Sequence, residues 1–198
     1  VNGQNIADNN PRETRMMNIS HIPEDRLTNG VAVRSSIKEN LIVDRYFRKP
    51  FKRGIFLNKK EIDSSTNELI QQFGIKTPNG DLPVSSLSGG NMQKVVVARE
   101  FSSNPYILIA SQPTRGIDVG ATEFIREQLV VKRTEGTAVL LVSADLGEVM
   151  SLSDRIITLY EGKVTGVFPD ASQVTEEQLG TYMLGVNQMT PEEMEAKL

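Results

Sequence analysis

The stretch "VSSLSGGNMQKVVVARE", residues 84–100, places two adjacent glycines directly before a helix-forming run. Glycine removes side chains where a ligand must approach the backbone, and a helix start presents free N–H groups and the positive end of the helix dipole. Ser88 adds a hydroxyl to this turn. The pattern therefore predicts a phosphate-binding turn at Ser88–Gly90, although the same residues would also suit a flexible turn that only caps a helix.

The composition narrows the possible functions. The 198 residues suffice for one domain with a core, or for one domain and a small appendage, and hydrophobic (38%) and charged (24%) residues are ordinary for a globular protein. The net charge of −3 disfavours a general nucleic-acid or anionic-membrane binder. With no cysteine, disulfides and thiolate metal sites are excluded. No apolar run approaches the ~18 residues that a membrane span needs.

Continuous apolar strands that alternate with helices predict a parallel sheet covered by helices. The expected strands are 19–22, 106–110 and 138–144, with a later hairpin that turns at Glu161-Gly162. The expected helices begin at about Ser36, Lys59, Met92, Thr122, Leu146 and after Thr175. Asn2-Gly3 is a further hairpin turn signal.

The ordered motifs resemble those of the nucleotide-binding domains of ABC transporters. Five residues match that family's signature motif: Leu87, Ser88, Gly89, Gly90 and Gln93. The resemblance continues with Ser111 and Gln112 at the positions of the Walker B acids, residues 116–119 as the D-loop, and Ala144 at the switch-histidine position. It implies an α/β fold with a parallel-sheet P-loop NTPase-like core, incomplete at the N-terminus, an α-helical subdomain and a short antiparallel hairpin region.

Two segments narrow the resemblance further. Residues 23–26 ("PEDR") and 113–121 ("PTRGIDVGA") look like the second, C-terminal ATPase half of importers for simple sugars or nucleosides. The chain would then be a single partial nucleotide-binding domain. We expect a hairpin and Q-loop region at 1–29, a helical subdomain with the signature at 30–104, a core at 105–168, and a C-terminal helix and tail at 169–198.

No Gly-x-x-x-x-Gly-Lys-Ser/Thr loop occurs in the sequence, which begins with Val1 rather than Met. The family places this Walker A loop just before the segment "VNGQNI", so we expect the chain to be a fragment that lacks it. ATP and Mg²⁺ are accordingly expected as cofactors of the complete two-half protein.

Other losses lie within the chain. Mg²⁺ prefers anionic oxygen, whereas Ser111 offers a neutral hydroxyl, and the amide of Gln112 cannot accept a proton as a carboxylate base does. The only histidine is His21, on an early strand, so none is available at the switch position of Ala144. We therefore predict that the chain's own site is hydrolytically inactive.

The resemblance assigns a different role to the intact signature. ABC domains pair head to tail, so Ser88, Gly89 and Gly90 would clasp the γ-phosphate of an ATP held by the first ATPase half. Asp118 would act across the dimer as the D-loop acid, or would only cap the following helix, and both can hold together. Glu24 stands at the Q-loop position, and it also suits a solvated loop acid.

The partners follow from the same resemblance. They are the first ATPase half, integral membrane permease subunits that dock on the helical subdomain, and an extracellular solute-binding protein indirectly, with no nucleic acid expected. The chain would lie at the cytoplasmic face of a bacterial membrane as a peripheral protein. The alternative is a regulatory or nucleic-acid-associated module of ABC type that engages no permease.

The segment "DRYFRKPFKRG", residues 44–54, interleaves five basic residues with three aromatic ones. Such interleaving occurs in sites for nucleic acid or anionic lipid. A solvated loop with its aromatic side chains folded inward is the simpler interpretation.

Overall fold

The computed structural model of the chain describes residues 1, 3 and 5–197. The turn predicted at Asn2-Gly3 involves Asn2, which lies outside the described residues, so it stays a prediction. The described chain divides into two compact units, residues 1–140 and 141–198. Each unit is described by itself.

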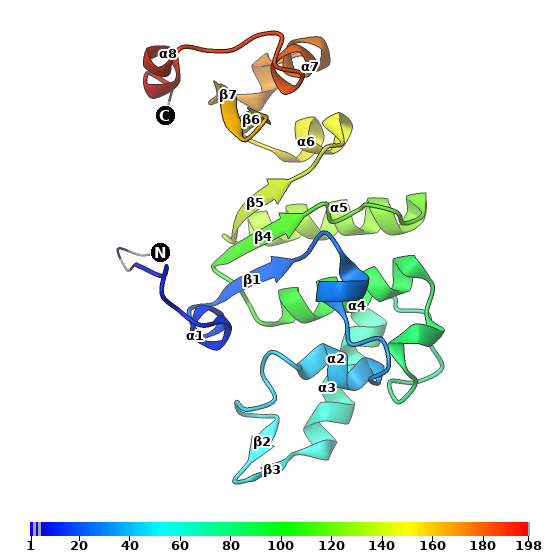
Figure 1. The fold of residues 1–198 in the computed structure, drawn as a ribbon. Coiled ribbons are helices and arrows are strands. Elements are labelled where there is room, and N and C mark those ends of the chain that lie inside the picture. Colours follow the sequence, from blue (N-terminus) through cyan, green and yellow to red (C-terminus); the bar gives the residue numbers. More distant parts are fainter. Residues whose placement is uncertain (2, 4, 198) are drawn as a thin grey trace. The chain divides into compact units, whose positions relative to one another are not determined.

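A parallel sheet forms the centre of the first unit, as predicted. Its strand order is β1 (Ile19–Ile22), β4 (Ile107–Ser111) and β5 (Ala138–Val142), and β5 runs across the boundary between the two units. β1 pairs with β4 in parallel from Ile19↔Ile107 to Ile22↔Ala110 (Figure 1). Side chains of Ile22 and Leu108 are fully buried, which explains why these strands read as continuous apolar runs.

One helix contributes the longest run of buried residues in this unit. α4 (Gly89–Ser102) packs against β1, against α2 (Ile37–Ile42) and against α5 (Val119–Thr134). Its residues Val95–Ala98 have no exposed surface. The burial extends to polar residues of the helix, because Gln93, Arg99 and Glu100 are buried as well.

The helix starts follow their capping residues. Ser36 and Glu39 form the predicted capping box at the start of α2. α3 (Lys59–Gln72) matches the predicted helix, and Gly74 follows it with a φ of +56°. The helix expected from Thr122 begins earlier, at Val119, because Asp118 caps it.

Two elements of the first unit were not expected. α1 (Pro11–Met16) begins with a capping box between Asn10 and Glu13, yet it buries no residue and therefore shows no apolar stripe. The segment 44–54, expected to form a solvated loop, instead contains β2 (Lys52–Arg53), which forms a hairpin with β3 (Phe56–Leu57) just beyond it.

The aromatic residues before this hairpin are folded inward only in part, so that expectation is wrong for two of the three. Phe51 is buried with Ile42 and Ile62. Tyr46 is 48% exposed and contacts the half-buried Phe47 edge-to-face at 5.5 Å between ring centroids. The guanidinium of Arg12 covers the Phe47 ring at 4.1 Å, so a cation takes the place of core packing.

The second unit contains the predicted hairpin and helices, and one further helix in the segment that was expected to be a tail. Its elements are α6 (Leu146–Leu152), β6 (Ile156–Tyr160), β7 (Lys163–Phe168), α7 (Glu176–Met183) and α8 (Pro191–Glu195). Glu161 and Gly162 both have positive φ, which a two-residue hairpin turn requires. Its core gathers Ile156, Phe168 and Leu179. Among the described residues, no helix is long and apolar enough to cross a bilayer.

Candidate functional site

The start of α4 is a glycine turn in which Ser88 is exposed, Gly89 is half-buried and Gly90 is buried. Leu87 is 9% exposed and holds the turn to the core, while Ser88 is exposed and caps the helix. The Ser88 hydroxyl oxygen accepts hydrogen bonds from the Asn91 backbone N–H at 3.4 Å and from Asn91 Nδ2 at 2.9 Å. Within the described part of the chain, no group accepts a hydrogen bond from the N–H of Gly89 or Gly90. The turn therefore offers free donors at the positive end of a 14-residue helix.

The two glycines also bring other segments close to the turn. A Cβ atom at Gly90 would lie 2.8 Å from Asp118 Oδ2 and 3.1 Å from Ala121 Cβ. A Cβ atom at Gly89 would lie 3.0 Å from Arg26 Nη2. The start of α5 therefore approaches the start of α4 more closely than any larger residue at position 90 would allow.

Side chains from two elements fix the segment that precedes α5. The buried Gln93 donates from Nε2 to the Pro113 carbonyl oxygen at 2.7 Å. Arg26 donates from Nη1 to the Arg115 carbonyl oxygen at 2.9 Å and from Nη2 to the Gly116 carbonyl oxygen at 3.1 Å. Gln93 and Arg26 thus tie residues 113–116 to α4 and to the loop after β1.

Asp118 lies next to the glycine turn. Its side chain accepts a hydrogen bond from the Ala121 N–H at 2.9 Å, which confirms that it caps α5. The residue is exposed. Its expected part as a D-loop acid is compatible with this place, because the cap uses Oδ1 and Oδ2 faces Gly90.

The structure places Glu24 in an ion pair with Arg115. Both side chains are more than half exposed, so the pair contributes little to stability. Neither Arg26 nor Arg115 was expected at the site. The segments 23–26 and 113–121 each contain an arginine and at least one acid, and nothing in the sequence shows which of these groups pair.

The carboxyl end of β4 has no acid. Ser111 ends the strand, and Gln112 follows with a φ of +48°, an uncommon conformation for a residue other than glycine. Both residues are half-buried and neutral. Among the described residues, no group of three or more His, Cys, Asp or Glu side chains could hold a metal ion. These donors do not suit Mg²⁺, which prefers carboxylate oxygens.

Ala144 has no side chain that could act as a base, and His21 lies on β1. Ala144 lies in the second unit, between β5 and α6, and its methyl group cannot exchange a proton. His21 is on β1, as expected, where its backbone N–H donates to Glu100 Oε2 at 3.1 Å. Burial lowers the pKa of the His21 imidazole below its usual value.

The other end of α4 holds a buried charge cluster. Glu100 has no exposed surface, and its carboxylate accepts hydrogen bonds from Arg15 Nη2 and from Arg99 Nε, both at 2.9 Å. Burial alone would raise the pKa of Glu100, but the hydrogen bond and charge of Arg15, together with Arg99, hold that pKa below its usual value.

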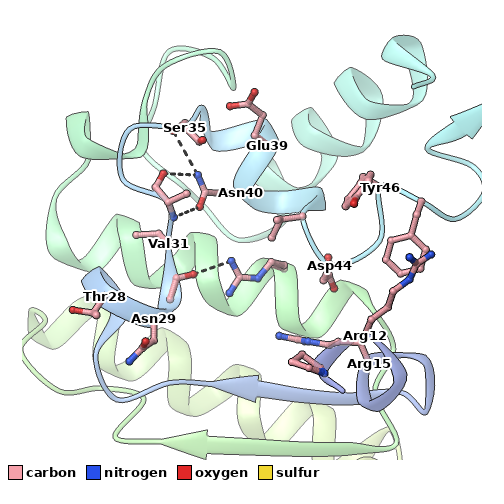
Figure 2. Close-up of a pocket in the computed structure, with 16 residues that line it drawn as sticks. Arg12, Arg15, Thr28, Asn29, Val31, Ser35, Glu39, Asn40, Asp44 and Tyr46 are labelled. Carbon is pink, nitrogen blue, oxygen red and sulfur yellow. Dashed lines mark hydrogen bonds between the residues drawn. The ribbon is translucent and has the colours of Figure 1, made fainter. Parts of the chain in front are cut away.

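A cavity of about 660 Å³ opens beside this cluster and is lined by α1, the turn at residues 28–32 and α2 (Figure 2). Asp44 lies in its wall between Tyr46 and the arginines of α1 (Figure 2). The Asp44 side chain is only 6% exposed, and its Oδ1 accepts no hydrogen bond. Burial raises the pKa of this carboxyl.

Comparison with known proteins finds a matching transporter family and several similar import ATP-binding proteins. The family described as ABC transporter matches residues 1–115. The chain is 40% identical over 188 residues to the guanosine import ATP-binding protein NupO of Bacillus subtilis, covering 95% of this chain and 37% of that protein. It is 37% identical over 187 residues to the nucleoside import ATP-binding protein NupA of Lactococcus lactis, covering 94% of this chain and 37% of that protein.

A sugar importer shows the same level of similarity. The chain is 38% identical over 188 residues to the glucose import ATP-binding protein TsgD13 of Haloferax volcanii, covering 93% of this chain and 34% of that protein. The chain thus spans little more than a third of the length of these curated relatives.

Solved structures share the fold. A dimeric ATP-binding cassette in a post-hydrolysis state, bound to ADP and Pi, has a TM-score of 0.68 and 22% identity, covering 84% of this chain and 70% of that chain. A nucleotide-free ATP-binding cassette from an ABC transporter also has a TM-score of 0.68, with 17% identity, covering 98% of this chain and 74% of that chain.

Proposed function

The chain belongs to the ABC transporter family and has the P-loop NTPase fold of ATP-binding cassettes, and from this premise we propose that its glycine turn binds an ATP held by another ATPase half. Ser88, Gly89 and Gly90 would donate to the γ-phosphate of that ATP. The complete protein would use ATP binding and hydrolysis to drive import of a sugar or nucleoside.

The observation that carries this proposal is the unsatisfied start of α4. The N–H groups of Gly89 and Gly90 point to no acceptor in the described part of the chain, and the helix dipole favours an anion there. Ser88 is exposed and Gly89 is half-buried, so a triphosphate would approach the turn from their side, with the buried Gly90 behind them.

The remaining residues of the signature position the turn rather than touch the ligand. Leu87 is buried, and Gln93 holds the Pro113 carbonyl from inside the unit. Arg26 holds residues 115 and 116 and thereby keeps Asp118 beside Gly90. Asp118 would reach toward the same ATP as the D-loop acid, with Oδ2 available for that contact.

The chain's own hydrolytic site is inactive in this proposal. Phosphoryl transfer depends on positioning and on electrostatic stabilisation by a metal and a base. Ser111 and Gln112 supply no carboxylate at the end of β4, and Ala144 supplies no imidazole. ATP and Mg²⁺ would therefore act only in the complete protein, at the site that the other half builds.

The partner of the cavity shown in Figure 2 would be a permease segment at the cytoplasmic face of the membrane. Oδ1 of Asp44 is buried without a hydrogen bond and lies 3.9 Å from Arg45 Nε, so a donor from the docked segment would stabilise this oxygen further. An extracellular solute-binding protein would take part only through that permease. The import relatives favour this function over a regulatory or nucleic-acid-associated module.

Replacing Gly89 with Asp in the complete two-half protein tests the proposal. The new carboxylate would repel the phosphate, and we expect hydrolysis to fall about 100-fold or more, as when a donor to a developing anion is lost. Gly180→Asp is the matched control, because Gly180 lies in α7 with no atom within 4 Å of an added Cβ. Equal hydrolysis by both variants, with unchanged folding, would reject the trans role.

A further inference from the structure

The segment of residues 45–60 concentrates positive charge in an acidic chain. It contains seven Lys or Arg and no Asp or Glu, whereas the whole chain has a net charge of −3. Five of these cations are exposed, and none of the five has an ion-pair partner in the described part of the chain. They are Lys49, Lys52, Arg53, Lys59 and Lys60. Nothing within the described residues neutralises them.

An apolar tip stands among these cations. Ile55, Phe56 and Leu57 are consecutive and are 89%, 72% and 52% exposed. Gly54 turns the chain with a φ of +64°. Large apolar side chains that gather on a surface indicate an interaction site, whereas scattered ones need no explanation.

The β2–β3 pairing places a basic side chain and an apolar side chain together on each face of the hairpin. Lys52 pairs with Leu57 and Arg53 pairs with Phe56, and directly paired residues share a face. Each face therefore presents one cation beside one apolar side chain, and Ile55 lies in the turn between the strands.

The base of the hairpin is fixed. Phe51 is 6% exposed and packs with Ile42 and Ile62. The Asn58 N–H donates to the Phe51 carbonyl oxygen at 2.8 Å and closes the hairpin. The hairpin points away from the sheet of the first unit (Figure 1). The exposed tip is thus presented by an ordered element.

Two of the cations occupy positions that folding disfavours. Lys59 and Lys60 are the first residues of α3, where the helix dipole repels positive charge. Glu61 in the same turn offsets only part of this charge, and the N-cap residue Asn58 makes no side-chain capping bond. A negatively charged partner would explain both the charge and its position.

We propose that hairpin β2–β3, together with the first turn of α3, binds an anionic membrane surface. Ile55, Phe56 and Leu57 enter the boundary between headgroups and acyl chains, and the surrounding lysines and Arg53 contact lipid phosphates. The tip favours a bilayer over a nucleic acid, because base stacking uses a series of aromatic rings and this tip has a single one. This inference does not depend on the ATP site.

Vesicle sedimentation with the 198-residue chain tests the proposal. We expect binding to phosphatidylcholine vesicles with about 30% phosphatidylglycerol, little binding to pure phosphatidylcholine, and weaker binding as salt screens the charges. Equal binding to both kinds of vesicle, or to neither, would overturn the proposal.

Paired variants separate the hairpin from the rest of the surface. Removing two charges with Lys52→Gln and Arg53→Gln should weaken binding about 25-fold, since each basic residue contributes about fivefold. The control is Lys76→Gln with Lys163→Gln, which removes two exposed charges elsewhere and should leave binding unchanged.

The apolar part is tested by Phe56→Ser, with Val186→Ser as the control because Val186 is 73% exposed. Only Phe56→Ser should release the chain from vesicles. Far-UV circular dichroism verifies that each variant is folded. Equal losses in test and control variants, or binding of single-stranded RNA through the hairpin without binding of vesicles, would refute a membrane role.

Discussion

The polar groups at the two ends of α4 differ in whether the chain itself supplies their hydrogen-bond partners. At its start, Gly89 and Gly90 keep free N–H donors beside an exposed Ser88. At its end, the carboxylate of Glu100 is fully buried and receives hydrogen bonds from Arg15, Arg99 and the backbone of His21. We call the end at Glu100 the satisfied end, because the fold supplies its hydrogen-bond partners. We call the end at Ser88–Gly90 the open end, because its N–H donors have no partner in the described part of the chain.

This difference distinguishes polar groups that stabilise the fold from polar groups that are available to bind a ligand. A buried charge must be paired, so the Glu100 cluster is explained by the stability of the fold. The N–H donors of Gly89 and Gly90 have no acceptor in the described part of the chain and therefore add nothing to its stability. Their arrangement is explained by an anion that comes from outside.

The largest expected loss of stability comes from removing the Glu100 carboxylate at the satisfied end of α4. Glu100→Ala leaves Arg15 and Arg99 without their acceptor and should lower the free energy of unfolding by about 3–5 kcal/mol. Urea denaturation measures this loss. Glu100→Gln keeps part of the hydrogen bonding and should lose less. A change below about 1 kcal/mol for Glu100→Ala would show that the cluster is not required.

A smaller effect should appear when acid removes only the charge of Glu100. Because its pKa is lower in the folded chain than its ordinary value of 4.5, ionised Glu100 stabilises the fold. That contribution is complete above pH 4.5 and is lost as the pH falls through the folded pKa. Urea denaturation from neutral to acidic pH should show a steeper loss for the wild type than for Glu100→Gln. Parallel curves would contradict the assignment.

Substitutions at Ser88, at the open end of α4, should lower the free energy of unfolding by less than Glu100→Ala does. Ser88→Ala removes the helix cap and should cost about 1 kcal/mol. Ser88→Asn restores a capping side chain and should recover that stability, but it lacks the hydroxyl at the turn. In the complete protein, hydrolysis should therefore fall in both variants. Full hydrolysis by Ser88→Asn would show that the hydroxyl matters only as a cap.

The smallest effect is expected at the end of β4, which Gln93 ties to the open end of α4. Ser111→Asp with Gln112→Glu, with or without Ala144→His, should not give phosphate release by this chain. In our proposal the glycine turn contacts a nucleotide that the other ATPase half holds, so two new acids at the end of β4 do not give this chain a nucleotide of its own to hydrolyse. Phosphate release that persists in highly purified protein and depends on the two new acids would refute this division of roles.

Local chemistry predicted much of the fold. The strand at 19–22 and the helix at 146–152 lie where the sequence places them, and the turn at Glu161-Gly162 follows from residues that tolerate positive φ. The hairpin at 52–57 was missed because none of its residues is buried, so it has no apolar alternation toward a core.

The sequence predicted the residues of the glycine turn and the nearby acid, but not the side chains that hold these segments in place. Ser88–Gly90 and Asp118 were identified from their order in the chain, and the structure brings Gly90 and Asp118 together. The contacts of Arg26 with residues 115 and 116 join positions about ninety residues apart, as do those of Glu24 with Arg115. Sequence spacing cannot predict such contacts, because they arise only when β1 and β4 pair.

The contacts around residues 113–116 have a consequence for protein design. A designer who grafts the short motif Leu87–Gly90 onto another helical scaffold would transfer the donors without Arg26 and Gln93, which hold the neighbouring segment. The smallest portable unit therefore comprises three pieces of chain: the loop after β1, the first turns of α4, and the link from β4 to α5.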